Sequence, residues 1–137
     1  MADTVSQRQY FYIQVPDKPG EGARALTTLK EAGVNLLAFT GFPEGRRAQL
    51  DFLPEDPVAF KRVAKAAGWR VTGPKRALLV QGDDRIGAIA DLVDKLASAK
   101  INIIGAEAAC AGGGRYAAII WVDQRNVARA AKRLGGA

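Results

Sequence analysis

The stretch D-K-P-G-E-G-A-R-A-L, residues 17–26, joins two different hydrophobic patterns. Apolar residues alternate along residues 10–15, which predicts a strand, and they recur at helical spacing along residues 21–32, which predicts a helix. A turn that leads from a strand into a helix holds the first, unpaired N–H groups of that helix, and these groups attract an anion. The stretch therefore predicts a strand, an anion-attracting turn and a helix.

The side chains at this turn suit a ligand that carries both charges. Gly20 and Gly22 have no side chain to block close approach to the backbone, and Asp17 offers a carboxylate to a cation. Asn35, on the strand expected after the helix, has an amide that both donates and accepts. An anion site, a carboxylate and an amide together suit a free amino acid.

The same pattern appears a second time, 67 residues later. Residues 84–106, D-R-I-G-A-I-A-D-L-V-D-K-L-A-S-A-K-I-N-I-I-G-A, align without a gap with residues 17–39. The matching pairs include Asp17 with Asp84, Gly20 with Gly87, Leu29 with Leu96, and Asn35 with Asn102. A repeat of this length predicts two tandem copies of one unit of about 65 residues.

Each unit is predicted to run strand, helix, strand, strand, helix. In the first unit we expect strands at residues 10–15, 34–40, 48–53 and 69–71 and helices at 21–32 and 57–67. In the second we expect strands at 77–81, 101–106 and 116–122 and helices at 87–97 and 126–134, with no evident final strand. This order predicts an α+β protein of two tandem ferredoxin-like (βαββαβ) units, 8–73 and 74–137, whose antiparallel sheets carry helices on one face. The Gly-Pro pair at 73–74 is expected to turn the chain between them.

The composition argues against several functional classes. The chain of 137 residues has no histidine and one cysteine, Cys110, so it offers no histidine-based catalytic pair, no zinc cluster and no internal disulfide. We therefore expect a protein that is not an enzyme and holds no cofactor. No apolar run reaches the ~18 residues that a membrane span needs, and the N-terminus is too polar for a signal peptide. With its single cysteine, the chain is predicted to be cytoplasmic.

At the repeated turn and the strand after the helix, the sequence resembles the ACT-domain family. The resembling motifs are D-K-P-G with V-N-L in the first copy and D-R-I-G with I-N-I in the second. The resemblance covers residues 10–134 as two tandem copies. It implies a regulatory, allosteric protein that binds an amino acid at paired domains and acts on an enzyme of amino-acid metabolism. Because edge strands and the absent final strand invite pairing between subunits, we also expect a homodimer.

The same resemblance indicates which residues contact the ligand. They are Asp17, Lys18, Pro19, Gly20, Asn35 and Leu36 in the first copy, and Asp84, Gly87, Asn102 and Ile103 in the second. The second copy departs from the pattern, because Ile86 stands where the first copy has its proline. Without that proline and without a final strand, the second copy is expected to be the weaker site.

Two other interpretations stay open. The turn residues are also what a plain connection to a capped helix requires, and each asparagine follows a helix end, where it can satisfy local backbone groups. The last predicted helix carries Arg125, Arg129, Lys132 and Arg133 on one face, and the net charge is +6. The alternative function is therefore a basic module that binds nucleic acid or a partner enzyme through this helix. Nucleic acid is the weaker partner, because the strands lack the exposed aromatic pairs on which RNA bases stack.

Overall fold

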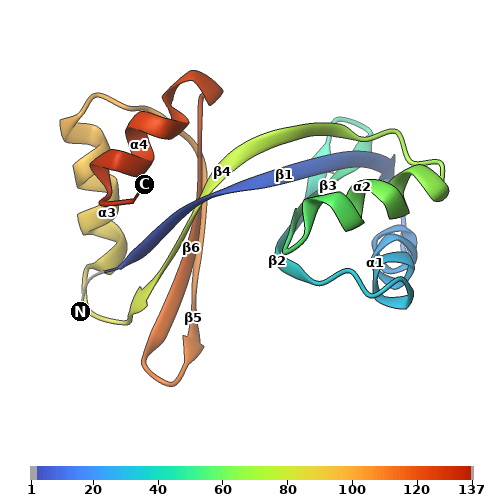
Figure 1. Cartoon of the computed structure of the whole chain (residues 1–137), viewed down its shortest axis with the longest axis horizontal. Coiled ribbons are helices and arrows are strands. Elements are labelled where there is room, and N and C mark those ends of the chain that lie inside the picture. The colour runs from blue at the N-terminus through green and yellow to red at the C-terminus, as the bar shows by residue number, and fades with distance from the viewer. Residues whose placement is uncertain (1–2, 137) are drawn as a thin grey trace. The chain divides into compact units, whose positions relative to one another are not determined.

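The computed structural model describes residues 3–136 and shows an α+β fold with one six-stranded antiparallel sheet of order β2-β3-β1-β4-β6-β5 (Figure 1). The strands are β1 (Thr4–Pro16), β2 (Leu36–Glu44), β3 (Arg47–Pro54), β4 (Thr72–Asp83), β5 (Ile103–Gly112) and β6 (Arg115–Val122). The helices are α1 (Glu21–Glu31), α2 (Pro57–Ala66), α3 (Ala88–Ser98) and α4 (Val127–Arg133), with a 3-10 turn, η1, at Gln124–Asn126. β2 and β5 are the edges of the sheet.

The contacts divide the chain into two compact units. The first, here the 9–75 unit, contains Gln9–Lys75. The second, here the 76–137 unit, contains Arg76–Ala137 together with the residues up to Arg8. The division cuts across β1 and β4, so each of these long strands contributes one part to each unit.

In the 9–75 unit, α1 and α2 cover one face of the strands. Phe11 and Ile13 of β1 stand opposite Phe52 and Leu50 of β3, and all four point to the same face because they alternate along their strands. The helical residues packed against them are Ala25 and Leu29 of α1 and Phe60 and Ala64 of α2. The positions 25 and 29 are four apart, as a buried helical face requires.

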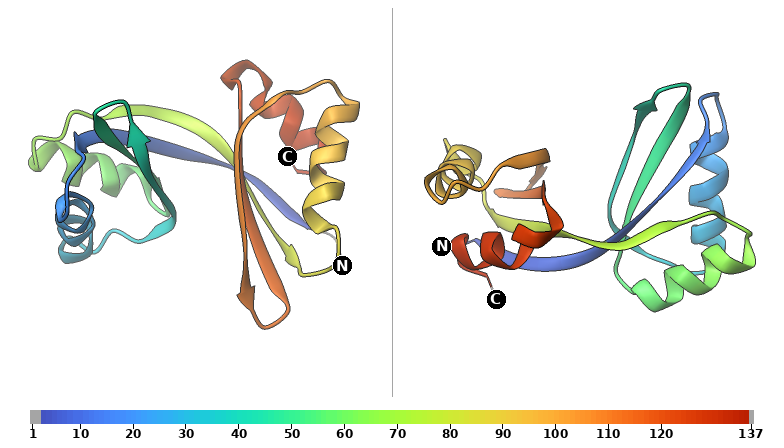
Figure 2. Two further views of the ribbon diagram at one scale, coloured as in Figure 1. Left: turned by 180° about the vertical axis from the view of Figure 1, so that it is seen from behind. Right: turned by 90° about the horizontal axis from the view of Figure 1, so that it is seen from above.

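The 76–137 unit has the same organisation, with α3 and α4 side by side (Figure 2). Leu78 and Val80 of β4 pair with Ile120 and Ala118 of β6, which sets these four side chains on one face of the strands. The helices contribute Leu92 and Leu96 of α3 and Val127, Ala130 and Ala131 of α4 to the same core. Each unit thus carries its helices on one face of its strands.

The strand that the sequence left out of the second unit is supplied by the chain's own first residues. Residues 4–8 of β1 belong to the 76–137 unit, and Val5 packs against its core. A Cβ on Gly136 would lie 2.9 Å from the Val5 carbonyl oxygen, and Arg76 donates a hydrogen bond to Gln7 at 2.9 Å. This strand was not predicted because residues 4–9, T-V-S-Q-R-Q, contain a single apolar residue and show no alternation.

The predicted turn at residues 73–74 and the predicted strand at 69–71 are both wrong. β4 runs without a break from Thr72 to Asp83, and residues 69–71 lie outside the strands. Gly73 has a φ of +126°, and a Cβ there would lie 2.9 Å from the Tyr10 carbonyl oxygen. The glycine is therefore needed for the close approach of β4 to β1, a use that sequence alone does not distinguish from a turn.

Candidate functional site

The helices that follow the repeated turn, α1 and α3, begin without a side-chain cap. α1 starts after Gly20 and α3 after Gly87, and both glycines are left-handed, with φ of 93° and 80°. The helix α2 shows the contrast, because the Asp56 carboxylate accepts hydrogen bonds from the main-chain N–H groups of Val58 (3.0 Å) and Ala59 (3.2 Å). The difference in capping therefore separates the first helix of each unit from α2.

The two aspartates that precede these glycines, Asp17 and Asp84, do not act as helix caps. In α3 the first intrahelical bond runs from the Asp91 N–H to the Gly87 carbonyl, so the N–H groups of Ile89 and Ala90 come before it in the helix. N–H groups at this position have no intrahelical partner and carry the positive end of the helix dipole. Both turns thus keep the capacity to bind an anion.

A groove of about 340 Å³ lies at the second turn. The turn itself contributes Asp84, Arg85 and Gly87, and the first residues of α3, Ala88–Ala90, form one side. The other side is Ala108–Cys110 of β5, with Tyr116 of β6. The groove therefore combines uncapped helix N–H groups and a carboxylate with walls of small, mainly apolar side chains.

Asp84 lies at the edge of this groove. The main-chain N–H of Asp84 donates to the Gly114 carbonyl at 2.8 Å. The Cys110 thiol donates to the Asp84 carboxylate, and this hydrogen bond, with burial and the negative charge, raises the pKa of the thiol above its usual value. Cys110 is therefore a protonated neighbour of the carboxylate at neutral pH, and not a reactive thiolate.

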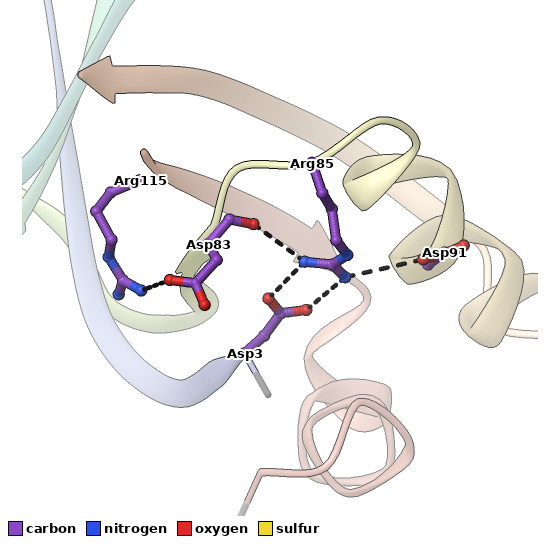
Figure 3. Close-up of polar contacts among 5 residues, drawn as sticks. All are labelled: Asp3, Asp83, Arg85, Asp91 and Arg115. Atoms are coloured by element: carbon purple, nitrogen blue, oxygen red, sulfur yellow. Dashed lines mark hydrogen bonds and ion pairs between the residues drawn. The ribbon is translucent and has the colours of Figure 1, made fainter. Parts of the chain in front are cut away.

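Arg85 ties the second turn to the N-terminal segment (Figure 3). Its two terminal nitrogens each lie 3.3 Å from an oxygen of the Asp3 carboxylate, and one lies 3.8 Å from Asp91 of α3. Burial alone would raise the pKa of Asp3, but the hydrogen bonds and charge of Arg85, the nearby Tyr116 hydroxyl and the charge of Lys95 outweigh it, and the pKa falls below its ordinary value. The turn and the N-terminal strand are thus held by charge-assisted contacts.

Tyr116 lines the groove, and Arg115 precedes it in β6. Burial, followed by the Asp3 carboxylate, raises the pKa of Tyr116 to about 12, so this phenol stays protonated at neutral pH. Arg115 pairs with Asp83 at 2.8 Å and connects β6 to the end of β4 (Figure 3).

The first turn is as exposed as the second, since residues 17–20 and residues 84–87 are all exposed. Asp17, Lys18, Pro19 and Gly20 are all exposed, and the turn is closed by a hydrogen bond from the Lys18 N–H to the Pro16 carbonyl at 3.0 Å. Two grooves of the 9–75 unit, of about 330 and 550 Å³, include none of these four residues. Residues 17–20 therefore border neither of these grooves, whereas Asp84, Arg85 and Gly87 of the second turn line the groove of about 340 Å³.

The predicted contact residues outside the two turns are Asn35 and Leu36 in the first copy and Asn102 and Ile103 in the second. Asn35 and Asn102 are exposed, and the Asn35 carbonyl accepts a hydrogen bond from the Glu55 N–H at 2.9 Å. Leu36 and Ile103 are half-buried against the cores of their units. The groove at the second turn includes Asp84 and Gly87 from the predicted set, and Asn102 and Ile103 do not line it.

Several residues of this groove were not found from the sequence. Cys110 stands opposite Tyr116 and Ala108 opposite Ala118 in the β5–β6 register, and this register decides which small side chains face the groove. A hairpin through three glycines does not reveal its register in the sequence. The sequence held one indication of a role for Arg85, since it occupies the position of Lys18 in the repeat. Its partner Asp3, however, directly precedes the strand that was not predicted.

Two cations on the basic face of α4 donate hydrogen bonds to carbonyl groups at the C-terminal end of α3. Arg129 donates to the Ala99 carbonyl at 2.9 Å, and Arg133 donates to the Lys95 carbonyl at 3.2 Å. Carbonyls in the last turn of a helix have no intrahelical partner and attract cations. Two of the four cations proposed for a nucleic-acid contact are therefore held against α3.

Comparisons with known proteins identify a fold and no family. No family model matches the sequence, and no curated protein matches it. Protein BT0572 from Bacteroides thetaiotaomicron has a similar structure, with 16% identity, a TM-score of 0.77 and coverage of 95% of this chain and 88% of that one. The ligand-free regulatory subunit of aspartate kinase from Thermus thermophilus is similar too, with 18% identity, a TM-score of 0.68 and coverage of 98% and 95%. The chain thus shares its ferredoxin-like α+β fold with a regulatory subunit.

Neither a metal-binding cluster nor a membrane-spanning helix is found within residues 3–136. No group of three or more His, Cys, Asp or Glu side chains in this part of the chain is placed to hold a metal ion. No helix within the same residues is both long and apolar enough to cross a bilayer. The polar side-chain groups that line the groove at the second turn are the Asp84 carboxylate, the Arg85 guanidinium, the Cys110 thiol and the Tyr116 hydroxyl.

Proposed function

We propose that the protein is a non-catalytic, regulatory module of two tandem ACT-type units, residues 8–73 and 74–137, that binds a free amino acid. The observation that carries the proposal is that α1 and α3, at equivalent positions of the repeat, both begin at a left-handed glycine without a cap and follow an aspartate. The repeated motifs that resemble the ACT family and the fold shared with an aspartate kinase regulatory subunit support it.

The second turn offers the better-formed site for such a ligand. The N–H groups of Ile89 and Ala90 suit a carboxylate, and Asp84 suits an ammonium. The small residues of the groove, Ala108 and Ala109 among them, leave room for an apolar side chain of modest size. Asn102 and Ile103, at the start of β5, are proposed as outer contacts.

The first turn is proposed as a second site. Its contacts are Asp17, Lys18, Pro19 and Gly20 of the turn and Asn35 and Leu36 next to and in β2. The two grooves described in this unit include none of the turn residues, so a ligand bound there is expected to bury less of its surface than one in the groove at the second turn. The first site is therefore proposed to bind more weakly than the second, the reverse of the order expected from its proline.

The proposed assembly is a cytoplasmic homodimer that acts on a partner enzyme. Because residues 4–8 already complete the sheet of the 76–137 unit, a missing strand no longer argues for dimerisation. The argument that remains is that β2 and β5 are sheet edges, and unpaired edges favour association with another strand. Light scattering of the purified protein measures the mass directly.

A thermal-shift screen against the twenty amino acids tests the proposed function. One or a few amino acids are expected to raise the melting temperature, because about 100 Kd of ligand stabilises the folded state by ~2.7 kcal/mol. Asp84→Asn is expected to abolish most of this gain. Asp94→Asn, an exposed position on the same helix, is the matched control and should keep it. No gain with any amino acid at millimolar concentration would contradict the proposal.

A further inference from the structure

The larger groove of the 9–75 unit lies apart from the turn residues 17–20. It has a volume of about 550 Å³ and is lined by Tyr12, Ile13 and Gln14 of β1, Arg47 of β3, Arg70 and Thr72. We call it the arginine groove. Most of its lining residues are polar or charged, in contrast to the alanine-lined groove at the second turn.

Three cations stand around the arginine groove. Arg47 is positioned across the end of β1 by a hydrogen bond from its guanidinium to the Gln14 carbonyl at 3.1 Å. Arg70 borders this groove and also the neighbouring one of about 330 Å³, which shares Ile13 and Gln14 with it. The Lys75 ammonium lies 5.8 Å from the centre of the Tyr12 ring.

These cations have no carboxylate partners within residues 3–136. The ion pairs of this part of the chain include none of Arg47, Arg70 and Lys75. Glu44 stands opposite Arg47 in the β2–β3 register but forms no ion pair with it. Arg24, on the far side of the neighbouring groove, shows the contrast, because Glu21 neutralises it at 2.8 Å.

We propose that the arginine groove is a binding site for a small dianion, a phosphate ester or a dicarboxylate. A guanidinium presents parallel N–H donors that match both groups in a bidentate way, and Arg47 and Arg70 offer two such donors on one hollow. The Thr72 hydroxyl and the Gln14 amide add neutral hydrogen-bonding groups at its wall. The ligand's charge takes the place of the carboxylates that these cations lack.

The surroundings favour a small molecule over a nucleic acid. The cations gather around one hollow, and acidic residues stand close by: Glu44 is opposite Arg47 in the β2–β3 register, and Glu21 pairs with Arg24 at the neighbouring groove. Single-stranded nucleic acids also need aromatic faces for stacking, and Lys75 lies over the ring of Tyr12, the aromatic residue of the groove. The site therefore lacks both a continuous cationic track and a free stacking platform.

The test is isothermal titration with pyrophosphate, malonate and a 20-nucleotide single-stranded DNA, at one ionic strength set with sodium chloride. We expect saturable binding of pyrophosphate or malonate to the wild type, and the tighter of the two identifies the source of the dianion. The double variant Arg47→Gln/Arg70→Gln is expected to weaken this binding about tenfold or more, since charged hydrogen bonds are lost. The matched control, Arg46→Gln/Arg62→Gln, removes the same charge from exposed positions outside the groove and should change affinity by less than about twofold.

Three results would overturn the proposal. One is no binding of either dianion. Another is an equal loss of affinity in the two double variants, which would show a diffuse effect of net charge. The last is binding of the DNA alone, with loss in the Arg47→Gln/Arg70→Gln variant, which would assign the groove to nucleic acid. A circular dichroism melt confirms that each variant is folded, and Asp84→Asn serves as a separate check because it should leave dianion affinity unchanged whatever the fate of the amino-acid site.

Discussion

The turn at residues 17–20 and the turn at residues 84–87 have the same backbone and different surroundings. Both end in a left-handed glycine, both precede an uncapped helix, and both begin with an aspartate. Both are exposed, but the second also lines a groove and is tied through Arg85 to Asp3. Equivalent local sequence thus produces equivalent local structure, but the quality of the site depends on segments from elsewhere in the chain.

The two turns differ in their surroundings because of the N-terminal segment, which consists of Asp3 and the first residues of β1. It gives the second turn a neighbouring carboxylate, Asp3, and gives the 76–137 unit its remaining strand. At the first turn, by contrast, Pro19 stiffens the chain locally, and the structure shows no ion pair for Lys18, the counterpart of Arg85, within the described residues. The same turn conformation is therefore stabilised by a proline in the first copy and by the Arg85–Asp3 contact in the second.

Removal of residues 1–8 should have the largest effect on this comparison. We expect it to cost the 76–137 unit roughly 3–5 kcal/mol, because strand hydrogen bonds, the packing of Val5 and the Asp3–Arg85 contact are lost together. Hydrogen exchange should show lost protection along residues 76–83 and in α3. Amides of α1 and α2 serve as the internal control. Uniform loss of protection in both units, or no loss in either, would contradict the account.

The sequence predicted the repeated turn, the four helices and their shared face, because these depend on local periodicity and on glycine and proline positions. It failed at Gly73 and at residues 4–8 for one reason. Both belong to long strands, β1 and β4, whose pairing is non-local, and a polar strand or a close-approach glycine has no local signature. The groove was predicted only in part for the same reason. Asp84 and Gly87 belong to the repeated motif, whereas Tyr116 and Cys110 are brought to the groove by the pairing of β5 with β6.

A smaller effect is expected where the helices α1 and α3 end. Gly33 follows α1 with a φ of 76°, and its counterpart Lys100 follows α3 with a φ of 57°. A left-handed conformation costs a side-chain-bearing residue about 1 kcal/mol more than glycine. Lys100→Gly should therefore stabilise the protein by about 1 kcal/mol in urea unfolding, and Gly33→Lys should destabilise it by about as much. Destabilisation by Lys100→Gly would show that the lysine side chain has a role that the backbone does not reveal.

The smallest effect is expected from the charge contact at the second turn. The pKa of Asp3 is lower in the folded protein than its ordinary value of 3.8, so its carboxylate stabilises the fold above about pH 4 and this contribution is lost as the pH falls through the folded pKa. Asp3→Asn should lower the melting temperature at pH 7 and have little effect near pH 2. Asp94→Asn, which has no ion pair in the described chain, is the control. An equal effect of Asp3→Asn at both pH values would exclude the charge as its cause.

The most direct test of the central claim is an amide chemical-shift titration of the full chain with the amino acid that gives the largest thermal shift, or with leucine if none does. The account predicts saturable shifts of the Ile89 and Ala90 amides, with weaker shifts of Gly22 and Ala23 at higher concentration, and loss of the first set in Asp84→Asn. Shifts that gather away from both turns, or no shifts at millimolar ligand, would contradict an amino-acid site at the uncapped helices.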